Sequence, residues 1–99
     1  MNMQDLMAQA QRMQRDITAK KEELENTDFI GKSEWVEVTF NGAKVMKKIN
    51  IIKEGDISNS DKEALEDMIQ LAVNDAYNQI NKAMTDKLGQ YAGVMDGLM

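Results

Sequence analysis

The sequence predicts an α+β fold in which a long helix, a three-stranded antiparallel sheet and a second long helix follow one another. Three observations predict it: apolar residues at helical spacing over residues 3–24, apolar and polar residues in alternation over residues 35–40 just before Asn41-Gly42, and helical spacing again over residues 65–88. The chain has 99 residues, the usual size of one domain. We therefore expect a single domain spanning residues 1–99, with its core at about 3–88.

The first helix is predicted from a seam of residues spaced alternately three and four apart, as in a coiled coil. The seam positions are Met3, Leu6, Ala10, Met13, Ile17, Lys20 and Leu24, of which only Lys20 is polar. Neither Gly nor Pro interrupts the segment, and good helix formers dominate it. A seam of this kind predicts a helix that packs against another helix.

The sheet is predicted from a change of periodicity after Asn26. A short strand is expected at Thr27–Ile30, a second strand at Trp35–Phe40 and a third at Lys44–Ile52. Asn41-Gly42 favours a hairpin between the last two strands, because this pair tolerates positive φ angles. One strand face should carry Val36, Val38 and Phe40, and the facing strand Val45, Ile49 and Ile51. The pattern leaves open whether the loop holds two residues or four.

The second helix is expected to start at Ser60, where Ser60 and Glu63 fit a capping box, and to end near Gly89. Its apolar face comprises Leu65, Met68, Ile69, Ala72, Val73, Ala76, Ile80, Ala83, Met84 and Leu88. Residues 89–99 contain three glycines and are expected to form a flexible tail that frays or orders on assembly.

Composition excludes most chemistry. The chain has no Cys and no His, which removes disulfides, the usual metal ligands and the commonest nucleophile and base pairs. We expect no enzyme activity, no cofactor, no metal and no small-molecule substrate. No apolar run is long enough to span a bilayer, so a cytoplasmic protein without a membrane partner is expected. Long amphipathic helices in so short a chain favour dimerisation.

Charge restricts any contact with nucleic acid to a local surface, because the net charge is -5. The basic residues of the two helices also have explanations that need no nucleic acid: a solvated helix face, ion pairs with Glu22–Glu25, and compensation of a helix dipole. Lys44, Lys47 and Lys48 could equally protect an exposed strand edge from aggregation.

Three segments resemble the YbaB/EbfC family of bacterial nucleoid-associated proteins. Leu6–Gln14 resembles the family's Met- and Gln-rich first helix, Val36–Gly42 its central strand and turn, and Leu71–Ala76 its Asn-Asp-Ala stretch. The resemblance covers roughly residues 3–88, and the three segments occur in the family's order.

The resemblance implies a tweezer-like homodimer with a shared sheet and protruding helices. It also implies binding to duplex DNA with weak sequence preference, a nucleoid location, and effects on nucleoid organisation and gene expression. By position, the implied DNA-binding residues are Arg12, Arg15, Lys20, Lys21, Lys82 and Lys87, with Lys47 and Lys48 as secondary candidates. A scaffold or prefoldin-like holdase without DNA binding is the alternative, because Met-rich apolar helix faces can also grip protein partners.

Overall fold

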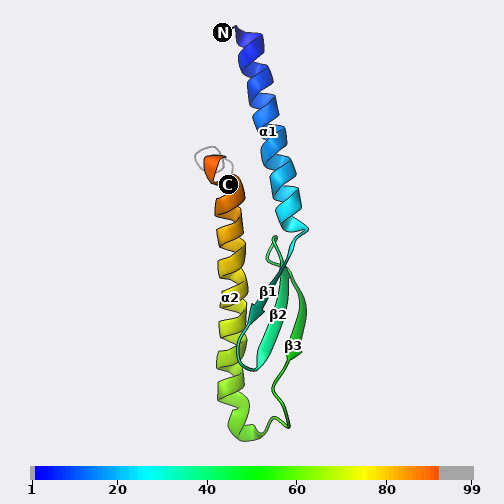
Figure 1. The fold of residues 1–99 in the computed structure, drawn as a ribbon, viewed down its shortest axis with the longest axis vertical. Coiled ribbons are helices and arrows are strands. Elements are labelled where there is room, and N and C mark those ends of the chain that lie inside the picture. Colours follow the sequence, from blue (N-terminus) through cyan, green and yellow to red (C-terminus); the bar gives the residue numbers. More distant parts are fainter. Residues whose placement is uncertain (1, 92–99) are drawn as a thin grey trace.

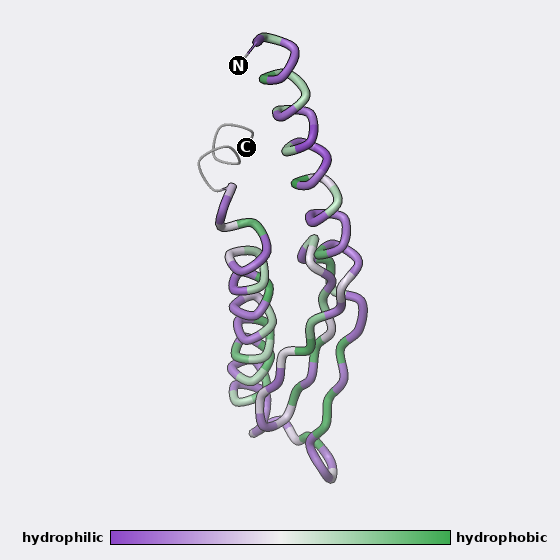
Figure 2. The backbone as a smooth tube through the Cα atoms, turned by 45° about the horizontal axis from the view of Figure 1, so that its top comes forward, coloured by the Kyte–Doolittle hydropathy of each residue, from purple (hydrophilic) through white to green (hydrophobic). Residues whose placement is uncertain are grey.

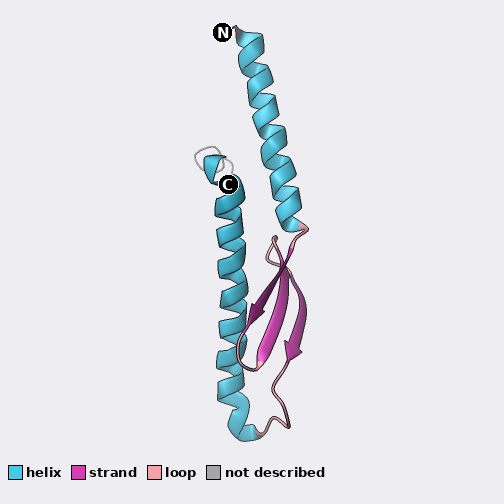
Figure 3. Ribbon diagram, in the orientation of Figure 1, coloured by secondary structure: helices cyan, strands magenta, loops and turns pink. Residues whose placement is uncertain are grey.

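The computed structural model describes residues 2–91 and has the predicted α+β architecture (Figures 1 and 3). Its elements are α1 (Met3–Glu25), β1 (Asp28–Lys32), β2 (Val36–Asn41), β3 (Met46–Ile51), the 3-10 helix η1 (Asn59–Asp61), α2 (Lys62–Leu88) and the 3-10 helix η2 (Gly89–Tyr91). The sheet is antiparallel, in the order β1-β2-β3. The predicted order of helices and strands is confirmed.

Helix α2 lies along one face of the sheet, over β1 and β2 (Figure 1). The alternation of β2 places every second side chain against this helix. The buried cluster consists of Val36, Val38, Phe40, Ala72, Ala76 and Ile80. Phe40 also meets Tyr77 edge to face, with ring centroids 5.2 Å apart. Trp35 packs at the margin of this cluster, as a packing anchor would.

Small residues allow α2 to approach β1 closely. Gly31 lies under Ala72 and Ala76, and a Cβ atom at Gly31 would collide with the Ala72 carbonyl oxygen. Such a Cβ would also lie 2.6 Å from the Ala76 nitrogen and 2.8 Å from its Cβ. Glycine is therefore required at position 31 by space.

Side chains of α2 cap the outer edge of β1. The Lys32 backbone N–H donates to the Asp75 carboxylate (2.9 Å), and the Gln79 amide donates to the Ile30 carbonyl oxygen (2.7 Å). These two bonds occupy backbone groups that a further strand would need. The sheet is thus closed to extension on its β1 side.

The hairpin loop holds four residues, 42–45, which resolves the alternative left by the sequence. The Lys44 N–H donates to the Asn41 carbonyl oxygen (2.9 Å), and Lys44, not Asn41 or Gly42, has positive φ (64°). The prediction that the third strand begins at Lys44 with Val45 on its apolar face is wrong. A bulge near Phe40 pairs that residue with Met46, so Met46 takes the place expected for Val45.

Gly42 serves close packing. Its N–H donates to the Thr27 carbonyl oxygen (3.1 Å), and a Cβ at this position would collide with the Leu24 carbonyl oxygen. The hairpin loop thus abuts the end of α1. The Asn-Gly pair predicts a local turn, but the glycine is needed for a close contact with Leu24 at the end of α1.

The start of α2 differs from the predicted capping box at Ser60. The chain enters through η1, where the Ser58 N–H donates to the Asp61 carboxylate (2.9 Å), and α2 begins at Lys62. This backbone hydrogen bond is the largest cause that lowers the pKa of Asp61. The capping carboxylate therefore lies two residues before the expected Glu63.

Among the described residues, helix α1 is packed from about Met13 to its C-terminal end. Ile17 and Leu88 are buried together, with Met13, Met84 and Tyr91 around them. Towards the N-terminus, Met3 and Leu6 are 74% and 50% exposed. The predicted seam is therefore covered by α2 only from about Met13 onwards.

The molecule is elongated, measuring 70 × 19 × 17 Å with a radius of gyration of 19.3 Å. A compact domain of this length would have a radius of gyration of about 13 Å. Helix α1 extends beyond the end of α2 (Figure 1). Of the expected tail, Gly89–Tyr91 forms η2, and residues 92–99 lie outside the described residues.

Candidate nucleic-acid interface

Arg12 and Arg15 are exposed on α1, on either side of Met13, where the contact with α2 begins. They are three residues apart, so they are neighbours on one face of the helix. Neither forms an ion pair within residues 2–91. Both guanidinium groups are therefore available to an outside anion.

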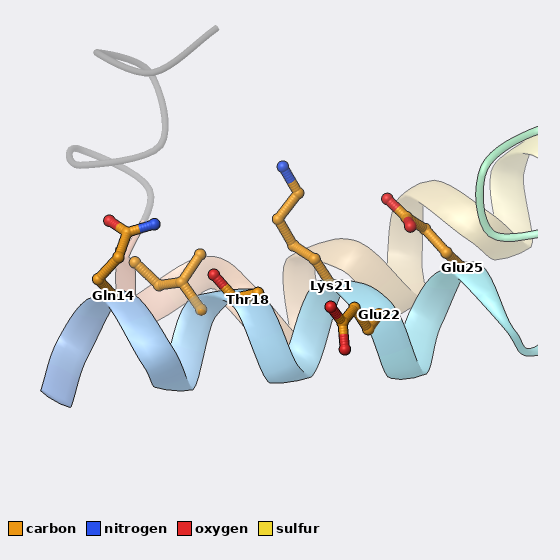
Figure 4. Close-up of a pocket in the computed structure, with 6 residues that line it drawn as sticks. Gln14, Thr18, Lys21, Glu22 and Glu25 are labelled. Carbon is orange, nitrogen blue, oxygen red and sulfur yellow. The ribbon is translucent and has the colours of Figure 1, made fainter. Parts of the chain in front are cut away.

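Lys21 is exposed beside a shallow hollow of about 270 Å³ along α1 (Figure 4). The hollow is lined by Gln14, Ile17, Thr18, Lys21, Glu22 and Glu25. No ion pair of Lys21 occurs in the described part of the chain. The carboxylates of Glu22 and Glu25 nevertheless weaken the positive potential around the Lys21 ammonium group. Lys21 should therefore attract an anion less strongly than the two arginines do.

Lys20 is half-buried, and its ammonium group already has partners. Its Nζ lies 3.3 Å from the Asp16 carboxylate and 5.5 Å from the centre of the Tyr91 ring. The Tyr91 hydroxyl donates a hydrogen bond to the Asp16 carboxylate. That bond is the largest cause that lowers the pKa of Asp16, with Lys20 adding to it, and it raises the pKa of Tyr91.

Lys87 is also engaged. Its Nζ lies 2.8 Å from the Glu23 carboxylate of α1, and this hydrogen-bonded ion pair lowers the pKa of Glu23. Lys82, five residues earlier on α2, is exposed and forms no ion pair with any described residue. Of the two predicted DNA-binding lysines of α2, Lys87 is thus engaged in an ion pair, whereas Lys82 can bind a phosphate.

The secondary candidates lie on the sheet. Lys47 forms an ion pair with Asp28 of β1 (3.1 Å). Lys48 pairs in register with Thr39, on the sheet face away from α2, and is exposed. The eight predicted residues therefore form no single cluster, because they are spread over α1, the end of α2 and the sheet.

Asp16, Glu23 and Tyr91 were not among the predicted site residues, although they decide which cations are free. The four-residue spacing of Asp16 and Lys20 is a readable helical ion-pair signal. Tyr91 lies 75 residues from Asp16, in a segment that its glycines made look flexible. Only the folded chain brings these two side chains together.

No group of three or more Asp or Glu side chains that could hold a metal ion occurs within residues 2–91. None of the helices that the structure describes is long and apolar enough to cross a bilayer.

Comparison with known proteins gives relatives that match most of the chain. A nucleoid-associated protein of Lactococcus lactis subsp. cremoris is 44% identical over 92% of this chain and 93% of its own length. One of Streptococcus equi subsp. zooepidemicus is 43% identical over 94% and 95%. The crystal structure of an uncharacterised protein from Helicobacter pylori has the same fold, with a TM-score of 0.69 and 23% identity over 100% of this chain and 99% of that one.

The model of the YbaB/EbfC DNA-binding family matches residues 1–95. The relatives' names and this match assign the chain to nucleoid-associated, DNA-binding proteins that are not enzymes. The chain belongs to the YbaB/EbfC DNA-binding family.

Proposed function

We propose that the protein acts as a homodimer that binds duplex DNA through the exposed cations of α1, chiefly Arg12 and Arg15, and thereby organises the nucleoid and affects gene expression. The observation that carries this proposal is the exposure of the two arginines on α1, the helix that extends beyond the end of α2. Their contacts would be with phosphates. Weak sequence preference follows, because phosphates carry no base identity.

Part of the acidic charge lies far from this contact. Glu63, Glu66 and Asp67 lie in the first turns of α2, at the opposite end of the molecule from the arginines (Figure 1). Helix α2 alone is about 40 Å long, and charges at physiological salt are screened over about 8 Å. Acidic groups at that end therefore repel DNA only weakly when it lies against α1.

An apolar strip on β3 supports the homodimer. Met46, Ile49 and Ile51 lie opposite the buried residues of β2, so they point to the same side of the sheet as those residues. Because α2 covers β1 and β2, these three side chains remain 41%, 46% and 52% exposed. Figure 2 shows the hydrophobic colour extending from the covered part of the fold onto this strand. Burying the remaining half of one such side chain contributes about 1 kcal/mol.

The two sheet edges differ in a way that favours a second copy at β3. The β1 edge is capped by Asp75 and Gln79 of α2, whereas the outer edge of β3 has no strand partner in the described chain. A β3 strand from a second copy can pair there and would bring the apolar strips of the two copies side by side on the same face of the sheet. A shared sheet in the dimer is the arrangement that meets both requirements.

Titration of duplex binding with salt tests the proposal. Affinity should fall steeply as salt rises, because bound phosphates release counterions. Arg12→Ala combined with Arg15→Ala should weaken binding equally for unrelated DNA sequences and flatten the salt slope by about two units, one for each lost contact. Lys62→Ala is the matched control, because it removes an exposed cation at the far end of the molecule and should leave binding unchanged.

Absence of binding at low salt, or affinity that does not respond to salt, contradicts the proposal. The holdase alternative makes the opposite prediction: suppression of the aggregation of an unfolding client without DNA binding. Membership of a DNA-binding family supports the DNA proposal over that alternative.

A further inference from the structure

Two polar contacts join α1 to the C-terminal end of the chain that the structure describes. Lys87 pairs with Glu23 at 2.8 Å, and the Tyr91 hydroxyl donates to Asp16, which also pairs with Lys20. We call these five residues the clasp. Asp16 and Glu23 are seven residues apart, so they lie two turns apart on the same side of α1. The clasp thus runs along one side of the helix contact.

Within residues 2–91, few other contacts fix the direction of α1. Its apolar contact with α2 centres on Ile17 and Leu88, and it forms a cluster separate from the main core. At its C-terminal end, Leu24 contacts the hairpin loop beside Gly42. The half that carries Arg12 has no packing from the described residues beyond Met13. A change at the clasp would therefore change the angle at which α1 presents its arginines.

We propose that Lys20, Lys87 and Tyr91 are positioning residues for DNA binding, which hold α1 at a fixed angle to α2 through Asp16 and Glu23 and do not themselves contact phosphates. This inference rests on the proposed function. It reassigns Lys20 and Lys87, which their sequence positions made candidates for direct contact. Their ammonium groups already have carboxylate partners, whereas those of Lys21 and Lys82 do not within residues 2–91.

The uncharged change Tyr91→Phe separates the two roles. It removes the hydroxyl that holds Asp16 and alters no charge at neutral pH. A positioning role predicts weaker DNA binding with an unchanged salt slope, because the phosphate contacts stay the same in number. Direct contact by Lys20 and Lys87 predicts unchanged binding, since both ammonium groups remain.

Reversal of the ion pair between Lys87 and Glu23 provides an independent test. Lys87→Glu should weaken binding, and adding Glu23→Lys should return the affinity to within about twofold of the wild type, because the pair is restored at the original net charge. An exposed pair of this kind changes affinity by up to about fivefold. Failure of the double variant to recover, with its fold intact by circular dichroism, overturns the assignment for Lys87.

A distance measurement tests the clasp without DNA. The chain has no cysteine, so Gln9→Cys on α1 and Asn78→Cys on α2 accept spin labels selectively. The labelled chain is diluted with excess unlabelled chain to exclude distances between copies. Tyr91→Phe and Lys87→Glu should broaden the distance distribution, and the reversed pair should narrow it again.

The outcomes distinguish the two proposals. Unchanged distances in Tyr91→Phe overturn the clasp, whether or not the protein binds DNA. Broadened distances with unaltered DNA affinity overturn the positioning role. A wild-type protein that binds no DNA overturns the proposed function, and the positioning role with it, while the distance measurement still reports on the clasp.

Discussion

Replacement of Gly31 by alanine tests the close contact between β1 and α2. The added Cβ would collide with the Ala72 carbonyl oxygen and lie 2.6 Å from the Ala76 nitrogen. Both atoms belong to the helix backbone, so relief requires movement of α2 away from the sheet. Overpacking of a core costs about 1–3 kcal/mol, and collision with backbone places Gly31→Ala near the upper end, at about 3 kcal/mol.

Thermal unfolding followed by circular dichroism, at fixed protein concentration, measures the effect. A loss of about 3 kcal/mol corresponds to a fall in Tm of about 12–24 °C for a domain of this size. Gly89→Ala is the matched control, because Gly89 has φ -56° and its nearest outside atom, Thr85 Cγ2, is 4.0 Å from a built Cβ. It should leave Tm unchanged or raise it. A Gly31→Ala protein within about 0.5 kcal/mol of the wild type would refute the packing argument.

Three further predictions follow from other contacts. Gly42→Ala should destabilise the protein by about 1–3 kcal/mol in urea unfolding, because the new Cβ meets the Leu24 backbone; equal urea midpoints for mutant and wild type would contradict this. Ile80→Ala should cost about 2–5 kcal/mol in the same assay, since Ile80 is fully buried beneath the sheet, and a smaller loss would place it outside the core. Hydrogen bonds lower the pKa of Asp16 and Asp61, so the stability that these carboxylates contribute is present above about pH 4 and is lost as the pH falls further. Unfolding measured at several pH values should show that Asp61→Asn reduces the loss of stability below about pH 4. The same loss in the variant and the wild type would exclude the Asp61 carboxylate as a cause of it.

The order and type of the elements could be predicted because each signal is local. The seam from Met3 to Leu24 and the alternation from Val36 to Phe40 depend on the helical and strand periods alone. The shape of the hairpin could not be predicted, because a bulge near Phe40 and the contact of Gly42 with Leu24 determine it. Both depend on segments that meet only after folding.

The candidate site was predictable in part for the same reason. Positive charge on α1 is visible in the sequence, but the availability of each cation depends on its partner in space. Lys20 and Lys21 are adjacent in sequence, yet the first contacts Asp16 and Tyr91 and the second is exposed. Sequence position alone therefore could not separate phosphate contact from an internal ion pair.

Helix geometry makes dimerisation and DNA contact compatible on α1. At 100° per residue, Arg15 lies about 180° around the helix from Leu6, and Arg12 lies about 120° from it. Leu6 lies on the part of the apolar seam that α2 leaves uncovered, and a partner helix that packed there, in addition to the β3 contact, would bury it. Covering that seam leaves the arginines on the solvent side. The same stretch of α1 can thus contact a partner chain on one face and DNA phosphates on the other, without competition between them.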